Sequence, residues 1–215
     1  MSYDLTKFKH GLEELNITLT DEQIEQFLRY YEMLVEKNKV MNLTGITEYE
    51  EVIQKHFLDS LSLIRVIPDI ASQELTVIDL GTGAGFPGLP LKIAFPELEI
   101  TLMDSLNKRI LFLQEVINAL DLKKVSAVHG RAEEMASNAA HRQQYDLCVS
   151  RAVSNLAVLT EYCLPFVKKG GLFVSYKSAD SDTEIQEGKK AISILGGKLT
   201  SVDKFQLPDS DLGRA

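Results

Sequence analysis

Three glycines spaced two residues apart are the part of this chain that most clearly indicates chemistry. Gly81, Gly83 and Gly85 follow a short apolar run that ends in Asp79, and a second apolar stretch comes after them. This layout is typical of a buried strand, a tight turn and the start of a helix, which together let the backbone approach a nucleotide-like ligand. Glycine is needed because a Cβ atom would block both a positive-φ turn and a close contact.

The spacing of these glycines distinguishes between ligands. A dinucleotide-binding loop reads G-x-G-x-x-G, whereas this loop reads G-x-G-x-G and carries Phe86 at the position of the third dinucleotide glycine. A P-loop is excluded, since no Lys-Ser or Lys-Thr pair follows. The loop therefore favours a ligand that has no pyrophosphate, such as S-adenosylmethionine.

Polar residues also follow the later expected strands, at the sheet edge where ligands bind in open α/β folds. Asp104 and Ser105 end the second strand, and an acid there can accept hydrogen bonds from both hydroxyls of a ribose. Ala132 and Glu133 follow the third strand, where they could flank an adenine ring, and Arg151 follows the fourth. Any one of them alone could be a solvated loop residue, but their joint placement indicates a ligand site.

The apolar pattern that must position these residues divides the chain into two parts. Residues 1–70 are expected to be helical, with one helix starting at a capping box between Thr20 and Gln23. Residues 71–215 alternate between strand and helix patterns, which predicts an α/β fold with a parallel sheet covered on both faces. No linker separates the parts, so the first is expected to be a helical cap rather than an independent domain.

The expected elements follow from the same pattern. Other cap helices are expected at 3–15, after a possible cap at Thr47, and at 57–67, where Pro68 ends the helix. Strands are expected at 75–80, 99–104, 125–129, 146–150, 171–177 and 198–207, and the intervening helices at 88–95, 107–120, 155–166 and 182–195.

Composition limits the function classes. The formal net charge of −8, from 31 acidic and 23 basic residues, argues against a non-specific nucleic-acid coat, although a local basic patch is compatible with it. The N-terminus lacks the pattern of a signal peptide and no apolar run reaches the roughly 20 residues of a membrane span, so a cytoplasmic protein with no membrane partner is expected. Cys148 and Cys163 are expected to be buried, reduced thiols.

Several motifs together resemble one protein family, the bacterial small-subunit ribosomal RNA methyltransferase G family (RsmG, also called GidB). The motifs are Asp79-x-Gly81-x-Gly83-x-Gly85-Phe86-Pro87-Gly88-x-Pro90, Asp104-Ser105-x-x-Lys108-Arg109, Gly130-Arg131-Ala132-Glu133, Ser150-Arg151-Ala152, Asn42-Leu43-Thr44 and His56-Phe57-Leu58-Asp59-Ser60-Leu61. The glycine loop alone would indicate only a class I S-adenosylmethionine-dependent methyltransferase with a Rossmann-like sheet. The Phe-Pro-Gly extension and the two cap motifs make the resemblance specific.

The resemblance implies transfer of a methyl group from S-adenosylmethionine to N7 of the guanine at position 527 of 16S ribosomal RNA, with that RNA or the small ribosomal subunit as the partner. The sequence does not indicate the oligomeric state, and a monomer is favoured. It places cofactor contacts at Gly81, Phe86, Asp104, Ser105, Leu106, Ala132, Glu133 and Arg151, beside the loop glycines Gly83 and Gly85.

The chemistry of guanine N7 asks for no general base, because the nitrogen carries a free lone pair and loses no proton before it attacks. Catalysis would rest on holding nucleophile and methyl group in line. No acid–base residue is therefore assigned, and Arg151, His56 and Asn42 are the candidates for positioning, although each could be structural instead. Asp59 is expected to be a structural partner of the cap. No metal site is assigned, since the histidines are not at metal-ligand spacing.

The chain departs from the family pattern at its end. Family members usually continue with a last strand and a basic tail, so we expect the sheet to lack that strand and to leave an edge open beside residues 198–207. Two other functions stay open: a non-catalytic cofactor-binding or ribosome-associated protein and, less favoured by the glycine spacing, an NAD-dependent oxidoreductase. A small-molecule methyltransferase is the weakest alternative.

Overall fold

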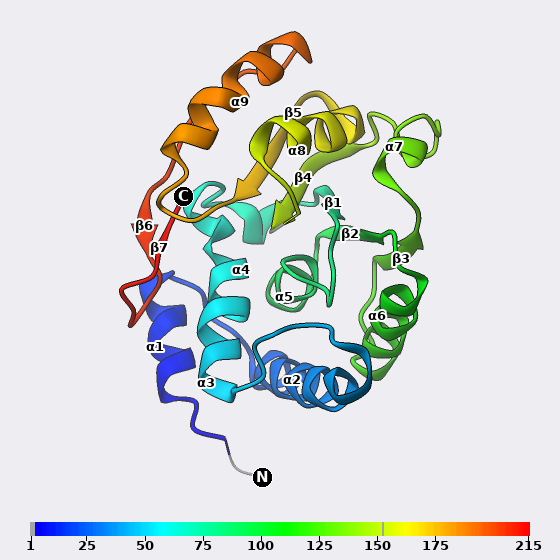
Figure 1. Ribbon diagram of the computed structural model, residues 1–215. Helices are drawn as coiled ribbons and strands as arrows, with labels where there is room; N and C mark the ends of the chain where they lie inside the picture. The colour runs from blue at the N-terminus through cyan, green and yellow to red at the C-terminus, as the bar shows by residue number, and fades with distance from the viewer. Residues whose placement is uncertain (1–2, 152) are drawn as a thin grey trace.

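The computed structural model describes residues 3–151 and 153–215, and Ala152 of the motif above lies outside them. Its centre is a parallel sheet in the order β3-β2-β1-β4-β5 (Figure 1). The strands are β1 (Thr76–Leu80), β2 (Glu99–Asp104), β3 (Val125–His129), β4 (Tyr145–Arg151) and β5 (Val167–Tyr176). The strand order reverses between β1 and β4, which creates the switch point where α/β proteins bind ligands. The predicted fold class is confirmed.

Helices cover both faces of the sheet, and the apolar side chains of β1 point to both sides, where they are buried. Val77 lies in the core shared with the N-terminal helices, and Ile78 lies in a second core under α8. The covering helices are α5 (Gly88–Ala94), α6 (Asn107–Ala119), α7 (Ala132–Met135), α8 (Leu156–Cys163) and α9 (Asp182–Ile194). Cys148 and Cys163 are buried free thiols in the second core, as predicted.

The N-terminal part is helical, as expected, and packs on the sheet rather than apart from it (Figure 1). It consists of α1 (Thr6–Glu14), α2 (Asp21–Met41), α3 (Tyr49–Val52), a π-helical turn (Ile53–Leu58), α4 (Asp59–Leu61) and 3-10 turns at Ser62–Arg65 and Ile70–Ser72. One continuous hydrophobic core runs from Phe8 and Phe27 in the cap to Leu102 in β2. The cap and the sheet therefore share their burial of apolar surface.

Local signals were right at the start of α2 and wrong at the start of α3. Thr20 and Gln23 form the predicted capping box, and the Gln23 amide also donates to the carbonyl of Ile93 at 2.7 Å. The predicted cap at Thr47 is wrong, since Glu48 occupies the N-cap of α3. The helix expected at 57–67 begins earlier because α3, the π-helical turn and α4 follow one another without a break.

The predicted strand at 198–207 is also wrong. Only β6 (Phe205–Gln206) forms there, and it pairs antiparallel with β7 (Gly213–Arg214) instead of joining the main sheet. The hairpin is attached just beyond the end of β5, where Ser178 and Arg214 form an antiparallel backbone bridge. Within the described residues no strand pairs with the outer edge of β5 itself, so residues 198–204 have no neighbouring strand. A groove of about 780 Å³ runs along this edge, lined by apolar side chains that include Leu172, Leu199 and Val202.

Candidate active site at the carboxyl ends of the strands

The residues predicted at the ends of the first three strands line one cavity. It has a volume of about 350 Å³ and lies at the carboxyl ends of β1, β2 and β3. Its lining includes Gly81, Asp104, Ser105, Ala132 and Glu133, all of them predicted cofactor contacts. The sheet therefore brings together residues that are far apart in sequence.

The glycine loop reaches this cavity because its backbone adopts conformations that other residues avoid. Gly81 and Gly83 have φ values of +73° and +62°. A Cβ atom on Gly81 would lie 2.5 Å from Cγ2 of Val153, so this position also allows a close approach. The amide of Gly81 donates to the carbonyl of Met103 at 2.9 Å, which ties the loop to the end of β2.

Asp104 organises the cavity from the end of β2. Its carboxylate is only 3 % exposed and accepts hydrogen bonds from the amides of Gly83 at 3.0 Å and Leu106 at 2.9 Å. The guanidinium of Arg109 completes the set at 3.1 Å. A carboxylate offers about four lone-pair positions, so a ribose diol that binds Asp104 must compete with Arg109 and not with the loop amides.

Asp79, in β1, binds both ends of the glycine loop. One carboxylate oxygen accepts from the hydroxyl of Thr82 at 2.6 Å and from the amide of Gly88 at 2.8 Å. The other oxygen is buried and has no hydrogen-bond partner among the described residues. Burial raises the pKa of Asp79 to about 6. A buried acceptor without a partner is costly, and a bound amino group or water would relieve it.

The cap closes the site from the side of β4. The ring of His56 stacks on Phe86 with centroids 4.3 Å apart, and the guanidinium of Arg151 lies 5.2 Å from the centre of the Phe86 ring. Arg151 donates to Asp59 at 2.6 Å and to Nδ1 of His56 at 3.3 Å. The other ring nitrogen of His56 lies 2.9 Å from the hydroxyl of Thr44.

His56 is a neutral ring in this setting. Nδ1 of His56 lies 3.1 Å from the carbonyl of Lys55 and 3.3 Å from the guanidinium of Arg151, while Nε2 faces the hydroxyl of Thr44. Burial, with the positive charge of Arg151 as the second cause, lowers the pKa of His56 to about 3. His56 is therefore a neutral ring beside Arg151 and not a second cation.

The predicted site residues thus fall into two groups. Gly83 and Leu106 bind Asp104 through their amides, beside the residues that line the cavity. Gly85 and Phe86 are buried toward the cap, and Arg151 lies in the cap interface rather than in the lining of the cavity. Asn42 is exposed and ends α2 with a φ of 49°, and no hydrogen bond of its side chain joins it to His56 or Arg151.

Several residues at the site were not singled out from the sequence. Thr44 orients His56, while Val153 and Tyr162 line the cavity. Thr44 lies in a quoted motif and could have been found there, but Val153 and Tyr162 carry no local signal. Asp59 is a structural partner of the cap, as predicted. Its second ion-pair partner, Arg214, is a residue that no motif indicated.

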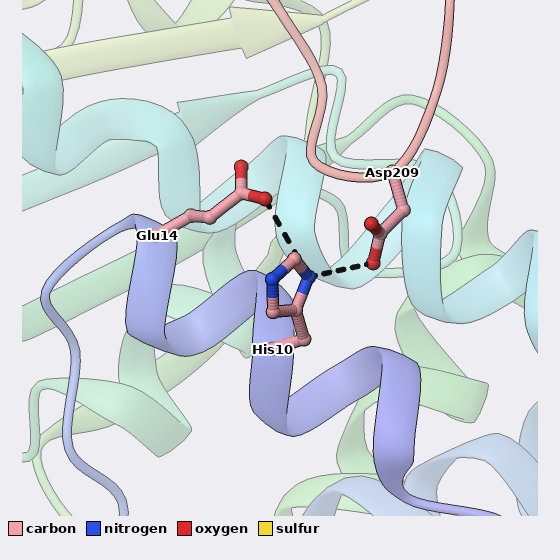
Figure 2. A group of neighbouring side chains, drawn as sticks. All are labelled: His10, Glu14 and Asp209. Atoms are coloured by element: carbon pink, nitrogen blue, oxygen red, sulfur yellow. Dashed lines mark hydrogen bonds and ion pairs between the residues drawn. The ribbon is translucent and has the colours of Figure 1, made fainter.

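A group of three residues away from the cavity, His10, Glu14 and Asp209, has ligand atoms close enough together to bind a metal ion. Nδ1 of His10 lies 2.9 Å from Asp209 and 3.5 Å from Glu14 (Figure 2). All three side chains are exposed, and the hydrogen bond that His10 donates to Asp209 raises the pKa of His10. Gln54 binds the carbonyls of Pro208 and Asp209 next to it. We interpret the group as an ion-paired tether that joins α1 to the loop between β6 and β7.

Comparison with known proteins identifies the family. Residues 23–212 match the family model described as GidB, rRNA small subunit methyltransferase G. The chain belongs to this family. It is 56 % identical to the ribosomal RNA small subunit methyltransferase G of Lachnoclostridium phytofermentans, over 98 % of this chain and 86 % of the relative. The counterpart in Bacillus licheniformis is 51 % identical, over 95 % of this chain and 85 % of the relative. The resemblance found from the motifs is confirmed, and the chain is a methyltransferase.

Solved structures of distant proteins share the fold. A SAM-dependent methyltransferase from Aquifex aeolicus has a TM-score of 0.55 at 15 % identity and covers 80 % of this chain and 94 % of its own. Fibrillarin from Aeropyrum pernix, solved with S-adenosyl-L-methionine, has a TM-score of 0.51 at 16 % identity, over 66 % of this chain and 65 % of its own. The sheet is thus of the class I methyltransferase type. Among the described residues, no helix combines the length and apolar character that crossing a membrane requires.

Proposed function

We propose that this chain transfers a methyl group from S-adenosylmethionine to N7 of the guanine at position 527 of 16S ribosomal RNA. The names of its relatives support an RNA of the small ribosomal subunit as the substrate. The observation that carries the cofactor is Asp104, a buried carboxylate held by the amides of Gly83 and Leu106 at the switch point of the sheet. We also propose that the protein acts as a cytoplasmic monomer.

The residues at the strand ends fit this cofactor. Asp104 would bind the ribose, while Ala132 and Glu133 lie in the same cavity, where an adenine would be held. Gly81 leaves room for the methionine part, and the unpaired oxygen of Asp79 favours a positively charged amino group nearby. The bound cofactor would supply an electrophilic methyl group on a sulfonium ion.

The protein's own contribution is alignment and charge placement. Because N7 of guanine attacks with a lone pair and releases no proton, a neutral His56 and an always charged Arg151 are compatible with the reaction. Arg151 and His56 stand beside Phe86 at the end of β4, where they can orient an incoming base or phosphate. Closing the site against water would strengthen their electrostatic effect.

Calorimetric titration tests the cofactor half of the proposal. S-Adenosylmethionine should bind the folded chain with one-to-one stoichiometry, and NADH should not, because the loop lacks the third dinucleotide glycine. Absence of S-adenosylmethionine binding by well-folded protein would contradict the proposal. Binding of NADH instead would favour an oxidoreductase.

Methyl mapping tests the substrate half. The chain is incubated with unmethylated small subunits and labelled cofactor, and the labelled nucleotide is located by mass spectrometry. We expect a single new methyl group at N7 of the guanine at position 527. Cofactor binding without transfer to subunits, to free 16S RNA or to an assembly intermediate would favour the non-catalytic alternative.

A further inference from the structure

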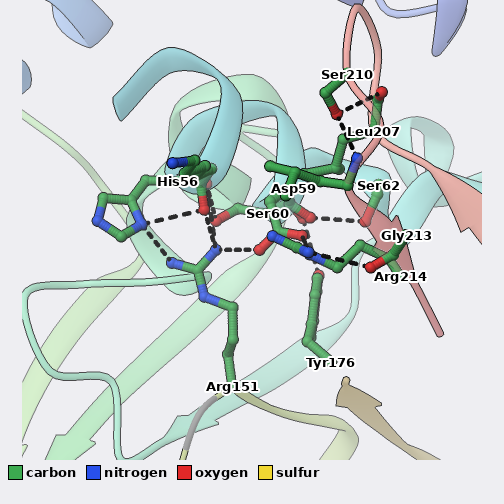
Figure 3. Close-up of polar contacts among 12 residues, drawn as sticks. His56, Asp59, Ser60, Ser62, Arg151, Tyr176, Leu207, Ser210, Gly213 and Arg214 are labelled. Carbon is green, nitrogen blue, oxygen red and sulfur yellow. Dashed lines mark hydrogen bonds and ion pairs between the residues drawn. The ribbon is translucent and has the colours of Figure 1, made fainter. Parts of the chain in front are cut away.

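Asp59 is a buried carboxylate shared by two arginines from distant parts of the chain. Its side chain is 4 % exposed; one oxygen accepts from Nη1 of Arg151 at 2.6 Å, and the other accepts from Nε of Arg214 at 2.7 Å (Figure 3). Arg151 ends β4 and Arg214 lies in β7, while Asp59 begins α4. One side chain of the cap therefore connects the end of the central sheet to the β6–β7 hairpin.

The charges of this group do not cancel. Arg151 and Arg214 each carry a positive charge and their side chains are only 11 % and 22 % exposed, whereas Asp59 supplies a single negative charge. His56 adds none, since it is neutral. Burying such a group is a poor way to gain stability, because desolvation offsets the attraction between the charges. A positive charge held in one place is instead what the phosphates of an RNA would bind.

The geometry around Arg151 fixes its guanidinium in one position. Besides Asp59 and His56, it donates to the carbonyl of Lys55 at 3.2 Å. That carbonyl lies in the π-helical turn Ile53–Leu58. Arg214 donates to the opposite oxygen of Asp59, so the carboxylate cannot rotate to bind Arg151 through both oxygens.

We propose that Asp59 and Arg214 are positioning residues for methyl transfer, which hold the Arg151 guanidinium beside Phe86 at the carboxyl end of β4. The proposal rests on the proposed function. It gives the β6–β7 hairpin a part in the reaction, although that hairpin lies outside the central sheet and contributes no residue to the lining of the cofactor cavity.

The test separates methyl transfer from cofactor binding. Asp59→Asn removes the shared charge, and Arg214→Gln removes the second anchor. We expect the single-turnover rate on unmethylated small subunits to fall about 100-fold for Asp59→Asn and about 10-fold for Arg214→Gln, since misplacement by about 1 Å has effects of this size. The dissociation constant for S-adenosylmethionine should stay within about twofold, because neither residue lines its cavity.

Arg65→Gln is the matched control. Arg65 donates to Asp203 at 2.7 Å and lies over the ring of Phe205, so it also anchors the C-terminal segment to the cap, but through a surface pair. This variant should change the rate less than twofold. Arg214→Lys should recover part of the rate, since the charge returns without the guanidinium.

Three outcomes would overturn the proposal. The first is a wild-type rate in both Asp59→Asn and Arg214→Gln. The second is a loss of cofactor affinity that matches the loss of rate, which would show a structural role. The third is a wild-type chain that binds the cofactor but transfers no methyl group, which would overturn the proposed function as well. Transfer by the wild type with unaffected variants would overturn only the inference.

Discussion

Two cavities in the described part of the molecule differ in what lines them. The cavity at the ends of β1, β2 and β3 measures about 350 Å³ and contains a buried carboxylate with two loop amides bound to it. The groove along β5 measures about 780 Å³ and is lined by exposed apolar side chains such as Leu172 and Val202, with Asp59 and Arg214 at its wall. The smaller cavity is the candidate active site. Convergence of polar groups at strand ends, and not volume, indicates where a ligand binds.

Matched Asp→Asn substitutions in the two cavities should give the largest difference, measured as affinity for S-adenosylmethionine. Asp104→Asn should weaken S-adenosylmethionine binding about 100-fold, because an amide cannot accept from the loop and from a ribose at both of its terminal atoms. Asp203→Asn, in the groove, should change it less than twofold. Titration calorimetry checks both. Equal losses would mean that the groove also contributes to the cofactor site.

Matched glycine substitutions should show how tightly each region is packed. A Cβ atom on Gly88 would lie 2.3 Å from Cδ2 of Leu102 and 2.8 Å from Oδ2 of Asp79, so Gly88→Ala should lower the free energy of unfolding by about 2–3 kcal/mol. Gly170, at the groove, has a φ of +86° and open space around it. Gly170→Ala should cost only about 1 kcal/mol from backbone strain. Urea denaturation measures both values, and a larger loss at Gly170 would contradict the comparison.

The pH dependence of stability should come from the candidate active site. His56 has a folded pKa of about 3 against its ordinary value of 6.5, so the unfolded chain binds more protons between these values. The stability linked to neutral His56 is present above pH 6.5 and is lost as the pH falls through this window. Asp79, whose pKa is raised to about 6 from 3.8, acts in the opposite sense, since its stability is lost as the pH rises.

His56→Gln should therefore remove part of the acid sensitivity. Between pH 7 and pH 4.5 the variant should lose about 2–3 kcal/mol less free energy of unfolding than the wild type, from a window of about two pH units at 1.36 kcal/mol each. Denaturation curves at several pH values provide the measurement. Parallel curves for the two proteins would show that His56 is not the group responsible.

The smallest effect is expected at the surface of the groove. Arg65 pairs with Asp203 while their side chains are 40 % and 34 % exposed. Arg65→Ala should lower the free energy of unfolding by about 1 kcal/mol or less, and less at high salt, because exposed pairs are screened by solvent and ions. A loss as large as that of Gly88→Ala would show that the groove is more rigid than its exposure suggests.

Sequence reasoning succeeded where local signals and burial agree. Strands β2 and β3 have the predicted limits because their apolar runs are bounded by polar and turn residues. It failed at 198–207, since an alternating pattern forms a strand only when a partner strand is available. The pairing of Asp59 with Arg214 could not be predicted, because the two residues are 155 positions apart and neither local pattern refers to the other. The π-helical turn that contains Lys55 has no sequence signal of its own.

The hydroxyl of Tyr30 connects the glycine loop to α2, the longest helix of the cap, by a hydrogen bond. Tyr30 is fully buried in α2 and donates to the carbonyl of Ala84 at 2.7 Å, and a Cβ atom on Gly85 would lie 2.8 Å from its oxygen. A shift in the equilibrium between conformations of the glycine loop should therefore change the local stability of α2. Slower amide hydrogen exchange should appear in α2 when the loop is occupied, at a distance from every group that touches the ligand.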